Sequence, residues 1–439
     1  MRIQENPPLH LTYCLNVHPG ESWEENFQAI RDKALRVRDL VGRKGPFGLG
    51  LRLSARAAKE LQEGKTLGEF RRFLDKEGLY VFTINGFPYG QFHDTAVKEN
   101  VYSPDWRRLE RFEYTAELAS ILAVLLPKGV EGSISTVPLS YKAWIRSDQD
   151  VRRMACLLAE AAAHLHTLAE GGKVITLALE PEPDCLLETT DELIRFLDGQ
   201  TQFAVAHLCR RKGLPAETAE RAWRRHIGVC LDTAHAAVEF EDPAESLRKL
   251  SRAGVRVGKV QLSSALRVTP TPEARRRLRE FCDRVYLHQV KARGADGTIV
   301  SYPDLPAALD AAETAEPTGQ EWRIHFHVPL FWQGDAGPAR MPAQEASRAE
   351  HAERGQACPP YRQGRQATAG DARPTAFGST SSLLVGEFAH LLRAGATSNV
   401  EIETYTFNVL PDFLRPADIA AGVAEEYRWV LENMFPGVG

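Results

Sequence analysis

The sequence predicts an α/β fold in which eight parallel strands close into a (β/α)8 TIM barrel. Short apolar runs alternate with longer amphipathic stretches along almost the whole chain of 439 residues, and this alternation is typical of a parallel sheet covered by helices. Polar residues stand at the carboxyl ends of nearly all the apolar runs. A doubly wound sheet would concentrate them at one switch point, so their spread favours a closed barrel.

The strand candidates number ten, two more than a barrel needs. Between them run helical patterns such as 23–41, 105–126 and 150–172. We expect one of the three runs at 259–265, 285–291 and 322–328 to belong to a hairpin insertion, and the sequence leaves open which is the seventh barrel strand. The ten runs lie at 9–16, 47–54, 80–86, 132–139, 174–180, 226–232, 259–265, 285–291, 322–328 and 399–407.

One segment differs from the rest of the chain. Residues 333–382 are rich in Gly, Pro, Ala, Gln and Arg and nearly lack aliphatic side chains. Such a stretch buries too little surface to offset the entropy of ordering it. We therefore expect a single domain over 1–439 with a mobile insertion at 333–382. A lid over the barrel mouth is the functional alternative.

Composition excludes several classes of protein. The formal net charge of -4, with interspersed signs, gives no broad basic surface and argues against a nucleic-acid partner. No window reaches the roughly 18 apolar residues of a membrane helix, and the amino terminus shows no leader pattern, so membrane insertion is not expected. The seven cysteines are scattered without a CxxC pair, which indicates a reducing compartment. We expect a soluble, cytoplasmic protein.

Three apolar runs end in a carboxylate that strand alternation turns toward the barrel interior. In two of them the apolar side chains occupy the positions that face the helices, which leaves Glu180 and Asp232 inward. In the last run Glu401 and Glu403 share the inward parity. Barrel active sites lie at the carboxyl ends of the strands. Glu180, Asp232 and Glu403 are therefore expected at one height around the mouth.

Inward carboxylates repel one another and are costly to bury unless a cation neutralises them. A divalent metal at the mouth would do so, and the alternative is a layer of buried salt bridges to Arg or Lys. Imidazoles favour the metal, because His325 and His327 share one face of their run and His288 lies in another. Mixed oxygen and nitrogen ligands suit manganese, magnesium, cobalt or zinc, which the sequence does not rank.

The first strands carry groups suited to recognising hydroxyls. Asn16 and His18 precede a Pro-Gly turn, Asn85 ends the third run and His93 follows it. Ordinary turn chemistry is the alternative for both loops. The chain has no phosphate-loop lysine, GxGxxG spacing or GxSxG elbow, so nucleotide binding through a glycine motif and acyl chemistry on a serine are not supported.

The strings LALEP with Glu180, CLDTAH with Asp232 and His235, and a late strand ending in Glu403 resemble the xylose-isomerase-like TIM-barrel superfamily. That superfamily contains sugar isomerases, sugar epimerases and metal-dependent apurinic endonucleases. The resemblance implies a metal held by a Glu, an Asp, a His and a Glu from the fifth to the eighth strands. Glu180, Asp232 and Glu403 match three of these four ligands.

The seventh strand departs from that pattern, because Gln261 of KVQLSSA stands at the histidine position. A Gln carbonyl is a weaker ligand, so either His288 or His327 fills the vacancy or the metal is held less tightly. The metal ligands expected on this basis are Glu180, Asp232, Gln261, His288 and Glu403.

A narrower resemblance is to the family of metabolite traffic proteins of the Ebo gene cluster, and it spans nearly the whole chain. The strings that carry it are TYCLNVHPGE, TINGFPYGQFH, LHQV, IHFHVPLF and EIETYTFNVLP. This resemblance implies partner proteins of a secondary-metabolite pathway.

Two functions are compatible with these residues. One is a metal-dependent isomerase or epimerase of a small sugar-like or polyol metabolite, with Glu180 and Glu403 as the acid and base and His327 as a further catalytic group. The other is a non-catalytic protein that binds such a metabolite and passes it to a partner, which the resemblance alone implies. The residues expected to bind the metabolite are Asn16, His18, Asn85, His93, His235 and His325.

Overall fold

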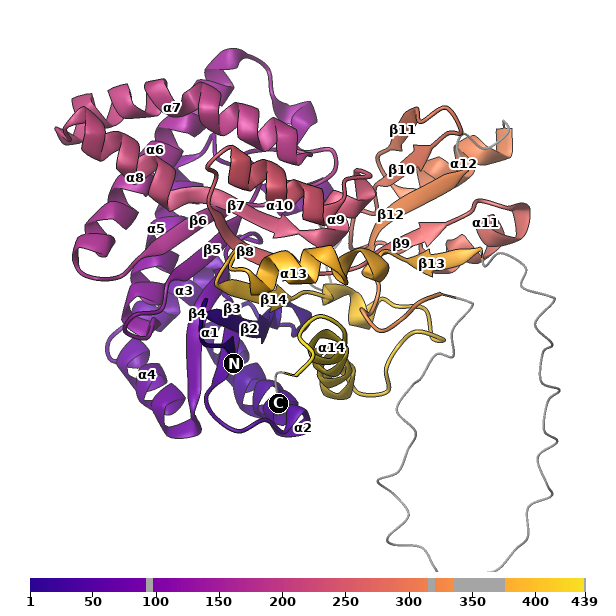
Figure 1. The fold of residues 1–439 in the computed structure, drawn as a ribbon, viewed down its shortest axis with the longest axis horizontal. Helices are drawn as coiled ribbons and strands as arrows, with labels where there is room; N and C mark the ends of the chain where they lie inside the picture. Colours follow the sequence, from indigo (N-terminus) through magenta and orange to yellow (C-terminus); the bar gives the residue numbers. More distant parts are fainter. Residues whose placement is uncertain (92–97, 315–319, 335–375, 438–439) are drawn as a thin grey trace, which may run out of the picture.

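The computed structural model describes residues 1–91, 98–314, 320–334 and 376–437, with a nine-stranded and a five-stranded sheet (Figure 1). In the larger sheet β1 (Arg2–Gln4) lies antiparallel to its neighbour, and the other eight strands are parallel in the order β2-β14-β8-β7-β6-β5-β4-β3. A bridge between Cys14 and Gly50 joins β2 to β3 and closes the barrel. The predicted (β/α)8 barrel is confirmed. Its strands are β2 (Leu9–Tyr13), β3 (Phe47–Arg52), β4 (Leu79–Asn85), β5 (Gly132–Thr136), β6 (Ile175–Leu179), β7 (Ile227–Asp232), β8 (Val257–Leu262) and β14 (Asn399–Ile402).

Helices surround the barrel (Figure 1). The helical pattern at 23–41 forms α1 and α2 around a π-helical segment, and Ser22 caps its start in a capping box with Glu25. The helices of the barrel are α1 (Trp23–Ala29), α2 (Leu35–Val41), α3 (Ala55–Gln62), α4 (Thr66–Glu77), α5 (Leu109–Leu125), α6 (Asp148–Glu170), α7 (Thr190–Lys212), α8 (Ala216–His226), α9 (Thr233–Val238), α10 (Pro243–Arg252), α13 (Glu387–Arg393) and α14 (Ile419–Asn433). None of the described helices is long and apolar enough to cross a membrane.

An ion pair lies inside the barrel, below its mouth. Lys259 of β8 pairs with Glu401 of β14, and both side chains are fully buried. Gly50 makes room for this pair, since a Cβ at that position would lie 2.0 Å from Glu401 Oε1. A buried pair of this kind is costly to break, because removing one partner leaves the other charge unneutralised.

The chain between β8 and β14 contains the second sheet, which lies beside the barrel (Figure 1). It is antiparallel, in the order β11-β10-β12-β9-β13. The run at 259–265 supplies the seventh barrel strand, while those at 285–291 and 322–328 both contribute to the second sheet, so the expectation that only one run was inserted is wrong. The elements are β9 (Ala265–Val268), α11 (Pro272–Leu278), β10 (Val290–Arg293), β11 (Ile299–Tyr302), α12 (Leu305–Thr314), β12 (Glu321–His327) and β13 (Phe377–Ser379).

The segment expected as a mobile insertion, 333–382, is described only at its two ends. At its carboxyl end β13 pairs with β9, so this part belongs to the second sheet rather than to a loop. Residues 335–375 lie outside the described residues. One buried apolar cluster includes side chains of both sheets, such as Leu177 and Ile324, which favours the single-domain interpretation.

Buried charges fix the second sheet against the barrel mouth. Lys291 of β10 is 4% exposed and lies 3.5 Å from Asp184, 3.0 Å from Glu188 and 3.0 Å from Glu239. Those three acids belong to the loop that follows β6 and to the end of α9. The carboxyl end of β12 is thereby held over the barrel mouth.

Candidate metal centre

Three carboxylates lie at the carboxyl-terminal end of the barrel. Glu180 follows β6, Asp232 ends β7 and Glu403 follows β14. All three are buried, and no described Lys or Arg nitrogen lies within 4.0 Å of their oxygens. Glu401 differs because it pairs with Lys259. The salt-bridge alternative therefore accounts for Glu401 and leaves the other three acids without a cation.

Each of these acids has one buried oxygen without a hydrogen bond. Oδ1 of Asp232 accepts from two main-chain N–H groups of α9 at 2.8 and 3.0 Å. Oε1 of Glu403 accepts from the side-chain amides of Asn16 at 2.7 Å and Asn85 at 3.2 Å. Glu180 Oε2, Asp232 Oδ2 and Glu403 Oε2 have no partner among the described residues. Carboxylate oxygens without partners that gather in one buried space are suited to hold a cation.

Three histidines complete the cluster, His235 from α9 and His325 and His327 from β12. Their Nδ1 atoms donate to the carbonyl of Pro181 at 3.1 Å, to Oε1 of Gln289 at 2.8 Å and to the carbonyl of Glu403 at 2.9 Å, respectively. These bonds leave the Nε2 lone pairs available, as in metal-ligating histidines.

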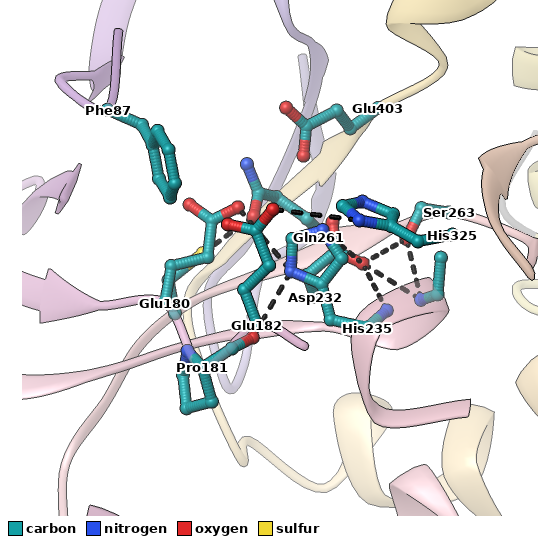
Figure 2. A network of polar contacts seen from close by, with 12 residues as sticks. Phe87, Glu180, Pro181, Glu182, Asp232, His235, Gln261, Ser263, His325 and Glu403 are labelled. Carbon is teal, nitrogen blue, oxygen red and sulfur yellow. Dashed lines mark hydrogen bonds and ion pairs between the residues drawn. The ribbon is translucent and has the colours of Figure 1, made fainter. Parts of the chain in front are cut away.

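The ligand atoms form two overlapping groups. Those of His235, His325 and His327 lie within 4.8 Å of one another, and so do those of Glu180, Asp232 and His235. Figure 2 shows the side chains of Glu180, Asp232, His235 and His325 around a common space, with Glu403 reaching toward it from the opposite side. The residues present therefore fit a divalent cation with mixed nitrogen and oxygen ligands.

Among the expected ligands, His288 does not point a free ring nitrogen into this space. His288 uses both ring nitrogens elsewhere, Nδ1 on the carbonyl of His325 and Nε2 on the carboxylate of Asp283. Gln261 accepts the thiol of Cys230 with its carbonyl oxygen at 2.9 Å, so its nitrogen is the atom left without a partner among the described residues. Turning this amide by half a turn would exchange the two atoms and present the carbonyl oxygen instead. The geometry thus argues against His288 as a ligand, whereas Gln261 stays a prediction.

The expected substrate-binding residues divide into three groups. Asn16 and Asn85 hold Glu403 and line the cavity at the cluster. His18 accepts or donates a hydrogen bond at 3.0 Å with the Tyr13 hydroxyl and does not line that cavity. His93 lies outside the described residues. The predicted residues that do line the cavity are Asn16, Asn85, Glu180, His235, His325, His327 and Glu403.

Burial and mutual repulsion govern the protonation of the acids. Burial, and next the charge of Asp232, raises the pKa of Glu180 well above its usual value. Burial, and next the charge of Glu180, does the same to the pKa of Glu403. Burial acts upward on the pKa of Asp232, but His235, His327 and the hydrogen bonds from Ser263 and the His235 N–H together outweigh it and lower this pKa. Without a cation the site favours one ionised acid, and a divalent cation would allow all three to ionise.

The cavity measures about 60 Å³, enough for a cation with ordered water or for part of a small ligand. Its wall contains a hydrogen-bonded chain that the sequence analysis missed. The Tyr102 hydroxyl donates to Glu182 at 2.9 Å, and Gln289, which holds His325, donates to that hydroxyl at 3.2 Å. Glu182 could have been found, since in LALEPEP it shares the parity of Glu180.

No protein-family model matches the chain, and no curated protein matches it. Among solved structures it is similar to an L-ribulose 3-epimerase, with 15% identity, a TM-score of 0.36 and coverage of 58% of this chain and 69% of that one. It is also similar to a xylose isomerase-like TIM-barrel protein from Mycobacterium smegmatis in complex with magnesium, with 15% identity, a TM-score of 0.36 and coverage of 59% of this chain and 76% of that one. A third similar structure is the probable 3-DHS dehydratase AsbF from Bacillus anthracis, with 14% identity, a TM-score of 0.34 and coverage of 70% of this chain and 90% of that one. At these TM-scores the likenesses carry no argument about activity, and the barrel assignment rests on the chain's own strand order.

Proposed function

We propose that the chain is a metal-dependent isomerase or epimerase of a small hydroxy-carbonyl compound. Four buried atoms without partners in the described part of the chain carry this proposal. They are the second carboxylate oxygens of Glu180, Asp232 and Glu403 and Nε2 of His327, and they come from four different elements around the barrel mouth. We propose these four residues as the metal ligands. Oε2 of Glu182 and Nε2 of His325 also lack a partner in the described part of the chain and are left for the substrate.

His327 takes the place that the seventh strand leaves open. Gln261 of β8 lies beside Glu401 in the strand register, and the main-chain N–H of Glu403 bonds to Leu262 of the same strand. His327 bonds to the carbonyl of Glu403 at 2.9 Å and so reaches the end of β8 from the second sheet. We therefore assign His327, expected as a catalytic group, to the ligands.

The catalytic work falls to the two glutamates. A bound divalent cation would withdraw charge from the substrate carbonyl and make the adjacent C–H more acidic. One of Glu180 and Glu403 accepts the proton from that carbon, and the other, on the opposite side of the cavity, returns a proton. Asn16 and Asn85 hold Glu403 in position for this step through Oε1.

His235 and His325 face the cavity and are suited to bind substrate hydroxyls. Burial lowers the pKa of His235 to about 4, so its imidazole is neutral. Its Nε2 can then accept a hydrogen bond from a substrate hydroxyl. His325 is oriented by Gln289 in the same way. These contacts would hold the carbon that exchanges its proton between the two glutamates.

The test is exchange of the substrate C–H with solvent. The full chain is loaded with manganese, cobalt, magnesium or zinc and incubated in D2O with ketoses and aldoses, and incorporation of deuterium next to the carbonyl is followed by NMR. We expect incorporation that chelator and Glu180→Gln each abolish. Failure of every loaded form to exchange any sugar would refute the catalytic proposal, and binding without exchange would favour the non-catalytic role. Partner proteins of a pathway rest on the sequence resemblance alone.

A further inference from the structure

We infer that the site accepts an uncharged polyhydroxy-carbonyl compound and excludes its phosphate esters. This inference rests on the proposed function and deepens it. Three features of the cavity support it: carboxylates at its centre, aromatic rings on its wall, and a lysine whose charge is neutralised by an aspartate of the chain.

Negative charge dominates the cavity. Glu180, Glu182 and Glu403 line it, and Asp232 lies within 4.8 Å of the Glu180 group. A divalent cation brings a charge of +2 to three ligand carboxylates of total charge -3, so the centre keeps a formal charge of about -1. A phosphate dianion placed beside it would be repelled, and strongly so in a buried site.

Among the described lining residues the single Lys or Arg is Lys98, and its ammonium group has no free hydrogen. It donates to the carbonyl of Tyr286 at 2.7 Å, to the carbonyl of Asp283 at 3.3 Å and to Oδ2 of Asp304 at 2.7 Å. An ammonium group has three donors, so all are engaged. Asp304 also neutralises the charge that a phosphate would need.

Within the described residues, the start of α9 at the barrel mouth offers a phosphate no better site. The N–H groups of Ala234 and His235 in the first turn of α9 already donate to Oδ1 of Asp232. Two other lysines near the mouth are also paired, Lys142 with Glu188 and Lys291 with Glu188 and Glu239. These described groups are the usual sources of phosphate affinity, and each is occupied by a carboxylate of the chain itself.

The remaining wall suits the apolar face of a sugar or cyclitol. Phe87, Tyr102, Tyr286 and Tyr405 line the cavity and are all at most 8% exposed. Figure 2 shows the ring of Phe87 beside the carboxylate of Glu180. Aromatic surface next to hydrogen-bond acceptors fits a molecule with C–H faces and hydroxyl donors. Hydroxyls can donate to the carboxylates, whereas a phosphate dianion offers acceptors only.

The first experiment compares matched ligands. The metal-loaded full chain is titrated by calorimetry with D-fructose, D-tagatose and D-psicose and with the 6-phosphate of each. We expect at least one free ketose to bind and every 6-phosphate to bind at least about tenfold more weakly than that ketose, which is a difference of about 1.4 kcal/mol in binding free energy. A 6-phosphate that binds as tightly as its parent overturns the inference, and so does a panel in which no free ketose binds.

A charge variant tests the cause. Asp304→Asn keeps Oδ1, which accepts from the main-chain N–H groups of His288 and Leu305 at 3.0 Å each, and removes the charge opposite Lys98. We expect it to bind the 6-phosphates at least about threefold more tightly than wild type with unchanged metal content. The control Lys98→Met/Asp304→Asn should lose that gain. No gain in Asp304→Asn overturns the role of Lys98, and if that variant does not fold, the ligand comparison in the wild type still decides.

The two proposals can fail separately. Metal content and deuterium exchange decide the proposed function, whereas the ratio of affinities for free and phosphorylated ketoses decides the substrate class. A chain without metal that still prefers free ketoses would refute the first and keep the second.

Discussion

Glu401 and Glu403 are two buried glutamates on one strand end, and the structure predicts opposite results for their substitution by Gln. Glu401 lies against Lys259, with both side chains fully buried. Glu403 has no described Lys or Arg within 4.0 Å and accepts from Asn16 and Asn85 through Oε1. Gln preserves the volume and one carbonyl oxygen at either position. The pair of variants therefore isolates the charge.

The expected magnitudes follow from these surroundings. In Glu403→Gln the carbonyl can keep both amide hydrogen bonds, and the side chain no longer has a carboxyl group whose pKa is raised by burial and by the charges of Glu180 and Asp232. The apoprotein should be as stable as wild type or more stable, while metal affinity falls by at least about tenfold, or ~1.4 kcal/mol. In Glu401→Gln the charge of Lys259 is left unneutralised, which costs roughly 3 to 5 kcal/mol of stability. Its metal affinity should change little.

Urea melts of wild type and both variants, each with and without chelator, measure stability, and titration with manganese or zinc measures affinity. The reasoning is refuted by a Glu403→Gln apoprotein that is several kcal/mol less stable and retains wild-type metal affinity. Such a result would make Glu403 a structural charge like Glu401. Loss of metal binding in Glu401→Gln at unchanged stability would also contradict the assignment of Glu401 to the ion pair and Glu403 to the metal.

Three further predictions concern the metal and pH. Glu180→Ala and Asp232→Asn should each remove the divalent metal that the protein carries when purified without chelator, and full occupancy by elemental analysis would remove the site as drawn. His327→Ala should weaken zinc at least about tenfold, while His288→Ala should change zinc affinity less than about twofold, and equal losses would contradict the ligand set. Burial raises the pKa of Glu426 from 4.5 to about 7. The unfolded chain releases this proton near pH 4.5, whereas the folded protein keeps it up to about pH 7. The stability of the wild type therefore falls as pH rises from about 4.5 to about 7. Both its hydrogen bonds, from Leu330 N–H and the Thr404 hydroxyl, reach Oε1, so Glu426→Gln should gain stability over wild type across that pH range, by about 3 kcal/mol at most, and a pH-independent difference would refute this.

The barrel strands and their acids could be predicted because the information is local. Alternation within a single run places Glu180 and Asp232 inward, and the barrel geometry brings the ends of those runs together. The division between Glu401 and Glu403 could not be predicted in this way, since both share one parity. It depends on Lys259 from one neighbouring strand and on Asn16 and Asn85, which lie after β2 and at the end of β4, far away in the sequence.

The second sheet could not be predicted for the same reason. The run at 322–328 has the character of a barrel strand, and its assignment depends on antiparallel pairing with β9 and β10, which lie well apart in the sequence. The sequence also offered His288 and His327 as equal candidates for the missing ligand. What separates them is whether the ring nitrogens are already bonded: both are for His288, whereas Nε2 of His327 has no partner among the described residues.

The position of His327 makes the second sheet part of the site rather than an appendage. In a barrel whose seventh strand ended in a histidine, the ligand set would be complete without any insertion. Here β8 presents Gln261 with its carbonyl engaged by Cys230, and the imidazoles of His325 and His327 arrive on β12, which Lys291 of β10 helps to hold over the mouth. The proposed metal ligands therefore come together only when the second sheet is docked. Because a bound metal stabilises the arrangement of its ligands, metal binding and docking of this sheet are thermodynamically coupled in the proposed site.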